Sequence, residues 1–199
     1  RRGGMGVANS TVLGAMAGDT MAAYVRTAGF REPDDVAIGS AVAATLRPTT
    51  LPPGDLDALR ESLYACMWDD VGILRAAAGW TRARAQLAAR SAELAASGIP
   101  AGTLAYNLTW HDWLNLRNLI SVSQVIVEAA LVREDSRGAH FREDFPQAGD
   151  LATSSYTVAR LDQGRIALTR EPVRFTRVAP GQSLIDAVEE TESALPVPV

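Results

Sequence analysis

The sequence predicts a mostly α-helical fold, in which a three-helix antiparallel bundle is followed by a small β appendage. Three stretches between residues 55 and 134 carry apolar residues at helical spacing. Two alternating stretches on either side of Asp162-Gln163-Gly164 indicate a β-hairpin. The chain has 199 residues, of which 47% are hydrophobic, so it can form one sizeable core or two small ones.

The N-terminal 28 residues are predicted as a glycine-rich turn that leads into a helix. Gly3, Gly4 and Gly6 precede the segment VANSTVLGAMAGDTMAAYVR, in which small residues recur. We expect this helix to be buried, because small residues let it pack tightly against a neighbouring backbone. It is too short for a membrane span, and Asp19 interrupts it. Residues 29–54 hold four prolines and are predicted as a linker with a short helix near DVAIGSAVAAT.

Residues 55–146 are predicted to form the bundle and a charged loop. Asp55 is the predicted N-cap of the first helix. The apolar residues of that helix recur along one face: Leu56, Leu59, Leu63, Met67, Val71 and Leu74. The second helix is predicted from about Trp80 to Ser97, with Gly98 and Pro100 at its end.

The third helix is predicted over the segment TWHDWLNLRNLISVSQVIVEAALVRE. One face of it is a continuous apolar stripe: Trp113, Leu116, Ile120, Val127 and Ala130. Further apolar residues lie on its other faces: Leu119, Val122, Val125 and Ile126. A helix that is apolar on several faces is typical of a buried position, so we expect this helix to be central in the bundle.

Charge and cysteine content exclude several classes of function. The net charge of −4 and the pI of about 5.2 argue against a general nucleic-acid-binding role. Cys66 is the only cysteine, which excludes an intrachain disulfide and a thiolate metal site and fits a reducing compartment. We interpret Cys66 as a small buried hydrophobic residue.

The densest cluster of charges is REDSRGAHFREDFP, residues 133–146. Its alternating signs predict ion pairs within the loop, and Gly138 permits a tight turn. His140 could act as a general base, but we favour a hydrogen-bonded packing histidine. Glu143 and Asp144 are interpreted as ion-pair partners. Elsewhere, the pair Asp69-Asp70 is expected on a solvated face.

His111 is expected to be a cap or a surface residue at the start of the third helix. His111 and His140 are 29 positions apart, and this spacing does not indicate a metal site.

Four segments carry a family resemblance. REDSRGAHFREDFP, MWDDVGILR, WLNLRNLISVSQVIVEAALV and RRGGMGVANSTVLGAMAGD resemble the C-terminal portion of the flavoprotein subunits of succinate dehydrogenases and fumarate reductases. L-Aspartate oxidases and adenylylsulfate reductases are relatives, but AHFREDFP is more similar to the dehydrogenase and fumarate reductase branch. The resemblance implies that residues 1–28 end a flavin-binding domain. A linker (29–54), the bundle with its loop (55–146) and a β appendage with the tail (147–199) would follow.

The resemblance also implies a cofactor and site residues. In the family, the start of the N-terminal helix faces the flavin ring of FAD near N1 and O2, where backbone amides favour hydride acceptance. One register places the amides of Gly6 and Val7 there, and a second register, with a four-residue gap, places Asn9 and Ser10 there. Arg1 matches the arginine that binds a dicarboxylate substrate. A third interpretation is that the glycines only allow tight packing.

The resemblance implies that this chain is part of an FAD-dependent oxidoreductase. The flavoprotein would interconvert succinate and fumarate, or act on a related substrate, and pass electrons to an iron–sulfur subunit. The expected partners are the remainder of the flavoprotein, the iron–sulfur subunit and the dicarboxylate, with no nucleic acid and no direct membrane insertion. The expected location is cytoplasmic, with any membrane association made through partner subunits.

No catalytic residue is assigned to this chain, because the family's proton-donating arginine lies in a capping domain that the sequence does not contain. The chain also lacks a G-x-G-x-x-G motif, so we expect it to be inactive alone. The alternatives are a stand-alone helical module that docks a partner, or an L-aspartate oxidase or adenylylsulfate reductase relative.

Overall fold

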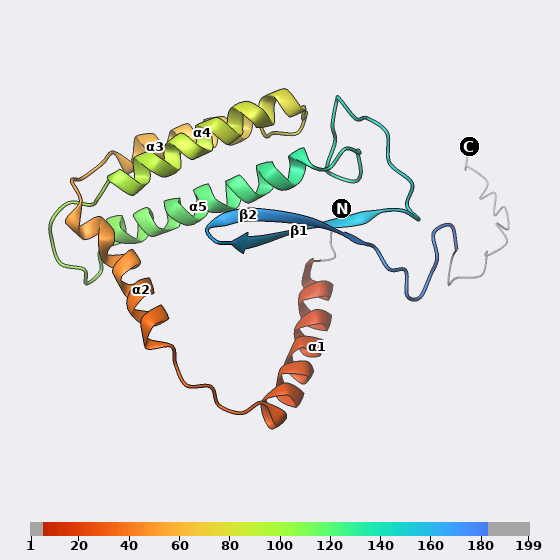
Figure 1. Ribbon diagram of the computed structural model, residues 1–199, viewed down its shortest axis with the longest axis horizontal. Coiled ribbons are helices and arrows are strands. Elements are labelled where there is room, and N and C mark those ends of the chain that lie inside the picture. The colour runs from red at the N-terminus through yellow and green to blue at the C-terminus, as the bar shows by residue number, and fades with distance from the viewer. Residues whose placement is uncertain (1–5, 183–199) are drawn as a thin grey trace, which may run out of the picture.

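The computed structural model of the chain describes residues 6–182 and confirms the mostly α-helical class (Figure 1). The α-helices are α1 (Gly6–Thr27), α2 (Asp35–Leu46), α3 (Leu56–Asp69), α4 (Ala77–Ala96) and α5 (Leu108–Leu131). A short 3-10 helix, η1 (Arg47–Thr50), follows α2. Strands β1 (Ser155–Asp162) and β2 (Arg165–Pro172) form a two-stranded antiparallel sheet.

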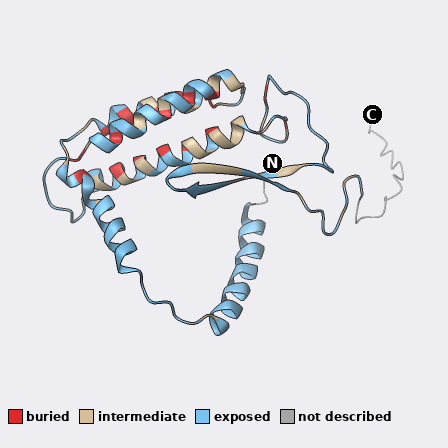
Figure 2. Cartoon of the chain, in the orientation of Figure 1, coloured by how far each residue is buried: buried red, intermediate tan, exposed pale blue. Residues whose placement is uncertain are grey.

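The predicted three-helix antiparallel bundle consists of α3, α4 and α5, and it holds the buried core. Figure 2 shows the buried residues on the faces that these helices turn toward one another. The core residues of the three helices are Leu56, Leu59, Leu63, Cys66, Trp80, Ala83, Leu87, Leu94, Trp113, Leu116, Ile120 and Val127. Cys66 is buried as predicted, and burial raises the pKa of its thiol, so it packs as an apolar residue.

Side-chain caps define where two of the bundle helices begin. The Asp55 carboxylate accepts a hydrogen bond from the amide of Ala58 at 2.9 Å, which confirms the predicted N-cap of α3. Asn107 caps α5 in the same way, accepting from the amide of Trp110 at 3.0 Å. His111 lies on the exposed surface of α5, which agrees with one of its two predicted roles.

Two details of the predicted bundle were wrong. Helix α3 ends at Asp69, so Leu74 lies outside the helix and its side chain is exposed. Helix α5 is not buried on all sides: Leu119, Val122 and Ile126 are 42%, 57% and 45% exposed. The reason is that α3 and α4 pack against one stripe of α5, and the hairpin that lies beside α5 does not cover the remaining apolar residues.

Helix α1 is also an exception to the sequence prediction, because none of its residues is buried. It lies apart from the bundle in Figure 1, and Gly14 and Gly18 have open space where a side chain would stand. Within residues 6–182, no element packs on α1, so its small residues contact no neighbouring backbone. None of the helices in this range combines the length and the apolar character that a membrane span requires.

The short helix predicted near DVAIGSAVAAT is present as α2, while the assignment of residues 29–54 as a linker stays a prediction. The N-cap of α2 is Asp34, whose carboxylate accepts from the amide of Ala37 at 3.0 Å. The C-terminal end of α2 is joined to α5, because the indole N–H of Trp110 donates to the carbonyl oxygen of Thr45 at 2.8 Å. The rest of α2 is exposed, like α1.

The predicted hairpin is confirmed with its turn at the expected residues. Asp162 pairs with Arg165, which leaves Gln163 and Gly164 as the two turn residues. Both have positive φ, 47° and 78°, which is the geometry of a type I′ turn. The tail that follows the hairpin lies outside the described residues from position 183 on.

Candidate functional site

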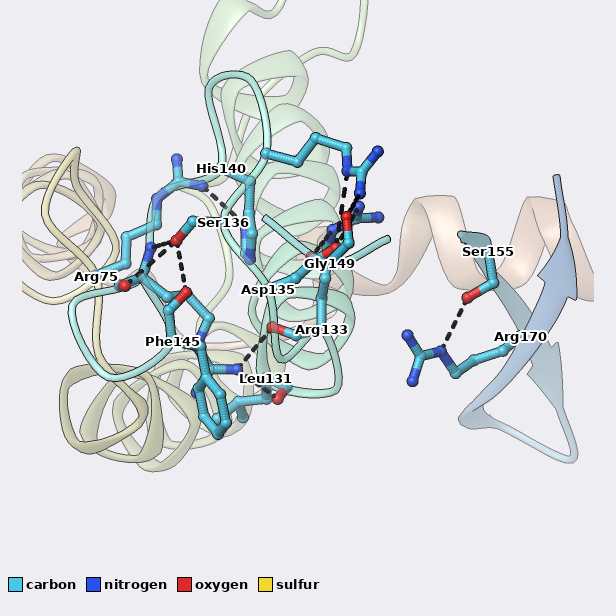
Figure 3. A network of polar contacts seen from close by, with 12 residues as sticks. Arg75, Leu131, Arg133, Asp135, Ser136, His140, Phe145, Gly149, Ser155 and Arg170 are labelled. Carbon is cyan, nitrogen blue, oxygen red and sulfur yellow. Dashed lines mark hydrogen bonds and ion pairs between the residues drawn. The ribbon is translucent and has the colours of Figure 1, made fainter. Parts of the chain in front are cut away.

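Figure 3 shows the charged loop after α5 with its residues Ser136, His140 and Phe145. The loop is built around Arg142, whose side chain is almost completely buried. Its Nη1 donates to the carbonyl oxygens of Leu131 and Arg133 at 3.1 and 2.7 Å. These carbonyls are at the C-terminal end of α5, where the helix dipole favours a positive charge. The guanidinium also lies over the Trp80 ring, 4.8 Å from its centroid. Arg142 therefore caps α5 and fills the space between the loop and α4.

Asp144 connects the same loop to the start of α4. It accepts from Nε and Nη2 of Arg142 at 2.8 and 2.7 Å, and from the backbone amide of Ala77 at 3.0 Å. Because of the hydrogen bonds from Arg142 and Ala77, the pKa of Asp144 lies well below its usual range. Asp144 thus serves as an ion-pair partner, as predicted. The Glu143 carboxylate makes no ion pair within residues 6–182, and only its backbone amide holds the loop, donating to the carbonyl of Arg75 at 2.8 Å.

Ser136 fixes the shape of the loop from inside. Its hydroxyl accepts from the amide of Arg142 and donates to the carbonyl of Phe145, both at 2.8 Å. Arg137 and His140 exchange two backbone hydrogen bonds around a turn in which Gly138 has φ of 61°. The turn predicted at Gly138 is therefore present, and the loop has a defined backbone path.

His140 is a packing residue in this structure, as the sequence interpretation favoured. Its ring stacks on Trp80 with centroids 5.7 Å apart, and Arg75 Nη1 lies 3.3 Å from its Nδ1. Burial lowers the pKa of His140, and the nearby positive charge of Arg75 lowers it further. The imidazole is thus held neutral at physiological pH, which is compatible with stacking on an indole.

A carboxylate away from the loop is also more enclosed than predicted. The Asp70 side chain is 10% exposed and pairs with Arg82, which donates to it at 2.7 Å. Gln86 donates to its other oxygen at 3.0 Å. The prediction of a solvated face was therefore wrong for Asp70, because α4 lies close enough for Arg82 and Gln86 to contact its carboxylate.

The residues predicted to face a flavin lie together at the start of α1. Gly6, Val7, Asn9 and Ser10 occupy the first turns of the helix, and all are exposed. The Ser10 hydroxyl donates to the carbonyl of Gly6 at 2.8 Å. No atom lies within 4 Å of a side chain built at Gly6, so tight packing does not explain this glycine among the described residues. Arg1 lies outside the described residues.

Sequence reasoning missed the residues that connect the loop to the rest of the bundle. Arg75, Ala77 and Trp80 come from the start of α4 and the segment before it, more than 50 residues upstream of Arg142 in the chain. The only usable signal was that a loop rich in both charges follows an apolar helix. It indicated ion pairs but could not identify partners so distant in the chain.

Comparison with known proteins assigns the family. Residues 60–185 match the family described as "Fumarate reductase flavoprotein C-term". The chain belongs to this family. The match includes α4, α5, the charged loop and the hairpin, and it does not reach α1 or α2.

Individual relatives agree with the family match. An uncharacterized FAD-dependent oxidoreductase of Methanocaldococcus jannaschii is 31% identical over 149 residues, 74% of this chain and 26% of the relative. The fumarate reductase flavoprotein subunit of Mycobacterium tuberculosis is 32% identical over 125 residues, 62% of this chain and 21% of the relative.

Among solved structures, "Mycobacterium smegmatis Sdh1 in complex with UQ1" is similar with a TM-score of 0.70 and 27% identity, over 77% of this chain and 27% of that one. The chain thus spans about a quarter of the length of the curated relatives it matches.

Proposed function

We propose that this chain forms the C-terminal part of an FAD-dependent oxidoreductase flavoprotein. The flavoprotein would interconvert succinate and fumarate, or act on a related substrate, and pass electrons to an iron–sulfur partner. The observation that carries this proposal is the family match over residues 60–185. It is supported by relatives whose names state FAD dependence or fumarate reduction.

The start of α1 is the part of the chain proposed to contact the flavin. The first described residues of α1 are Gly6 and Val7, and Asn9 and Ser10 follow within the next turn. The amides in the first turn of a helix have no intrahelical acceptors and are available as donors. One register uses the amides of Gly6 and Val7 as these donors, and the other uses those of Asn9 and Ser10. Bound FAD would supply hydride transfer, and the amides would stabilise the negative charge of its reduced form.

Arg1 is the proposed substrate-binding residue. An arginine presents a planar fork that can hold a carboxylate through two parallel hydrogen bonds, which suits one end of a dicarboxylate. The proposal rests on the family resemblance of the N-terminal segment.

The remainder of the flavoprotein is the proposed partner of α1. Val12, Leu13, Met16 and Val25 of this helix are all more than half exposed. Exposed apolar side chains gathered on one helix normally pack against another surface, and the flavin-binding domain is the surface that the family implies. The iron–sulfur subunit is the proposed electron acceptor of the whole assembly.

The experiment compares this chain alone with the whole protein that continues upstream of Arg1. We expect the whole protein to show a flavin absorbance spectrum and to oxidise succinate or reduce fumarate with an artificial electron carrier. We expect the chain alone to bind no flavin and to have neither activity. If the whole protein binds FAD but prefers L-aspartate as its substrate, the alternative that it is related to L-aspartate oxidases is correct. If it binds no flavin, the docking-module alternative replaces this proposal.

A matched pair of variants in the whole protein tests the flavin contact. Val7→Pro removes one amide donor, and proline is tolerated in the first turn of a helix. Val7→Ala keeps the amide. We expect Val7→Pro to lower the rate of flavin reduction on the order of 100-fold, the typical effect of losing one such donor. A normal rate in Val7→Pro, which leaves the amides of Asn9 and Ser10 in place, would support the other register.

A further inference from the structure

A cationic cleft of about 560 Å³ lies between the C-terminal part of α5, the charged loop and strand β1. Its lining includes Arg75, Arg133, Arg137 and His140, with Ile126 and Tyr156 contributing apolar and hydroxyl surface. No described Asp or Glu is among the lining side chains. The cleft is therefore a concave surface on which positive groups gather without a carboxylate at the surface itself.

Arg75 has hydrogen-bonding capacity left at this cleft. Its Nε donates to the carbonyl of Gly72 at 2.6 Å, and its Nη1 contacts His140 Nδ1. A guanidinium carries five N–H donors. Within residues 6–182, Nη2 of Arg75 has no acceptor, and no carboxylate pairs with this arginine.

Arg133 and Arg137 share a single carboxylate, that of Asp135. Arg133 Nε lies 2.7 Å from Asp135 Oδ1, while Arg137 Nε is 3.8 Å from Oδ2. Arg137 also donates from Nη2 to the carbonyl of Gly149, which Figure 3 shows beside Asp135. Nη1 of each arginine has no acceptor among the described residues. Arg133 and Arg137 thus share one carboxylate and Arg75 pairs with none, and each of the three arginines has a terminal nitrogen without an acceptor among the described residues.

We propose that this cleft binds a small oxyanion, such as a carboxylate or a phosphate. The guanidinium groups present planar pairs of donors that match the oxygens of such an anion. All three side chains are partly buried, so the attraction is screened less than at an open surface. Bound there, an anion would join the loop to β1 through Tyr156. The proposal does not rest on the proposed oxidoreductase function, because the cleft contains none of the residues assigned to flavin or substrate.

The test uses the full 199-residue chain and two probes, inorganic phosphate and succinate. Amide chemical shifts of Ala130 and Thr157, which line the cleft, are followed by NMR during titration at constant ionic strength balanced with chloride. We expect saturable shifts with either probe and no comparable shifts with chloride alone. Shifts that follow ionic strength without saturation would overturn the proposal.

Matched variants locate the site. Arg75→Gln and Arg137→Gln should each weaken probe binding about tenfold, as expected for loss of a charge-assisted hydrogen bond. Arg165→Gln, which removes the same charge at the exposed turn of the hairpin, should leave the affinity unchanged. Circular dichroism checks that each variant is folded. Equal weakening by all three variants would show a general charge effect and would overturn the proposal.

Discussion

Replacing Arg142 with methionine should strongly destabilise the bundle. Methionine keeps much of the aliphatic volume between Trp80 and Phe145 but removes all the guanidinium hydrogen bonds. The carbonyls of Leu131 and Arg133 lose their donor at the buried end of α5. The assay is urea unfolding followed by far-UV circular dichroism, which gives the free energy of unfolding.

The magnitude follows from the contacts that are lost. Each carbonyl left without a donor costs about 1–3 kcal/mol. The Asp144 side chain is 30% exposed, so its ion pair adds only about 1 kcal/mol. We therefore expect Arg142→Met to lower the free energy of unfolding by about 3–7 kcal/mol. A loss below about 1 kcal/mol would refute the reasoning, since it would mean that these contacts add nothing beyond packing.

A charge-reversed double variant serves as the control. Arg142→Asp combined with Asp144→Arg keeps one charge of each sign in the loop. It places a carboxylate at the C-terminal end of α5 and a guanidinium at the N-terminal end of α4, where each is unfavourable. We expect no recovery of stability relative to Arg142→Met. Recovery would show that the pair itself matters and that its placement at the two helix ends does not.

Three further predictions concern single sites. Gly98→Ala should lower the free energy of unfolding by about 2–4 kcal/mol in the same urea assay, because the added Cβ would stand 2.2 Å from the carbonyl oxygen of Leu51. Gly102→Ala is the control, and it should have little effect because Gly102 has open space around it. Gly164→Val should destabilise the hairpin by about 1–3 kcal/mol, seen as faster amide hydrogen exchange in β1 and β2, because φ of 78° is strained for a β-branched residue; unchanged exchange would contradict the turn geometry. Asp144→Asn should remove part of the acid sensitivity of the chain. The depressed pKa of Asp144 stabilises the fold at pH values above 3.8, the ordinary pKa of an aspartate. This contribution is lost as the pH falls below 3.8. Unfolding measured from neutral pH down to pH ~2 should therefore show the two proteins converging in stability at the acid end, and parallel curves would contradict the assignment.

Local signals were sufficient to predict the elements whose causes are local. Asp55 caps α3 because its carboxylate reaches an amide three residues away, and the hairpin turns where Gln163 and Gly164 can adopt positive φ. The apolar stripe of α5 was also readable, since its period of 3.6 follows from helix geometry. What the stripe could not predict is which of the other apolar faces has a partner.

The exposure of α1 could not be predicted from the sequence for a related reason. Its small residues permit close packing, but burial also requires a second surface, and no such surface exists within residues 6–182. The same limit applies to the candidate site. Gly6 and Val7 could be placed at a helix start from sequence, whereas the contacts of Arg142 with Trp80 and of Asp144 with Ala77 depend on how the bundle folds.

The antiparallel order of the helices explains why the charged loop contains both signs so close together. At the end of the bundle where the loop lies, α5 ends and α4 begins, so carbonyls without donors and amides without acceptors are neighbours. A cation suits the first group and an anion suits the second. Arg142 and Asp144 are two residues apart and meet both needs while pairing with each other. The density of charge after so apolar a helix therefore follows from the two opposite helix ends that one short segment has to cap.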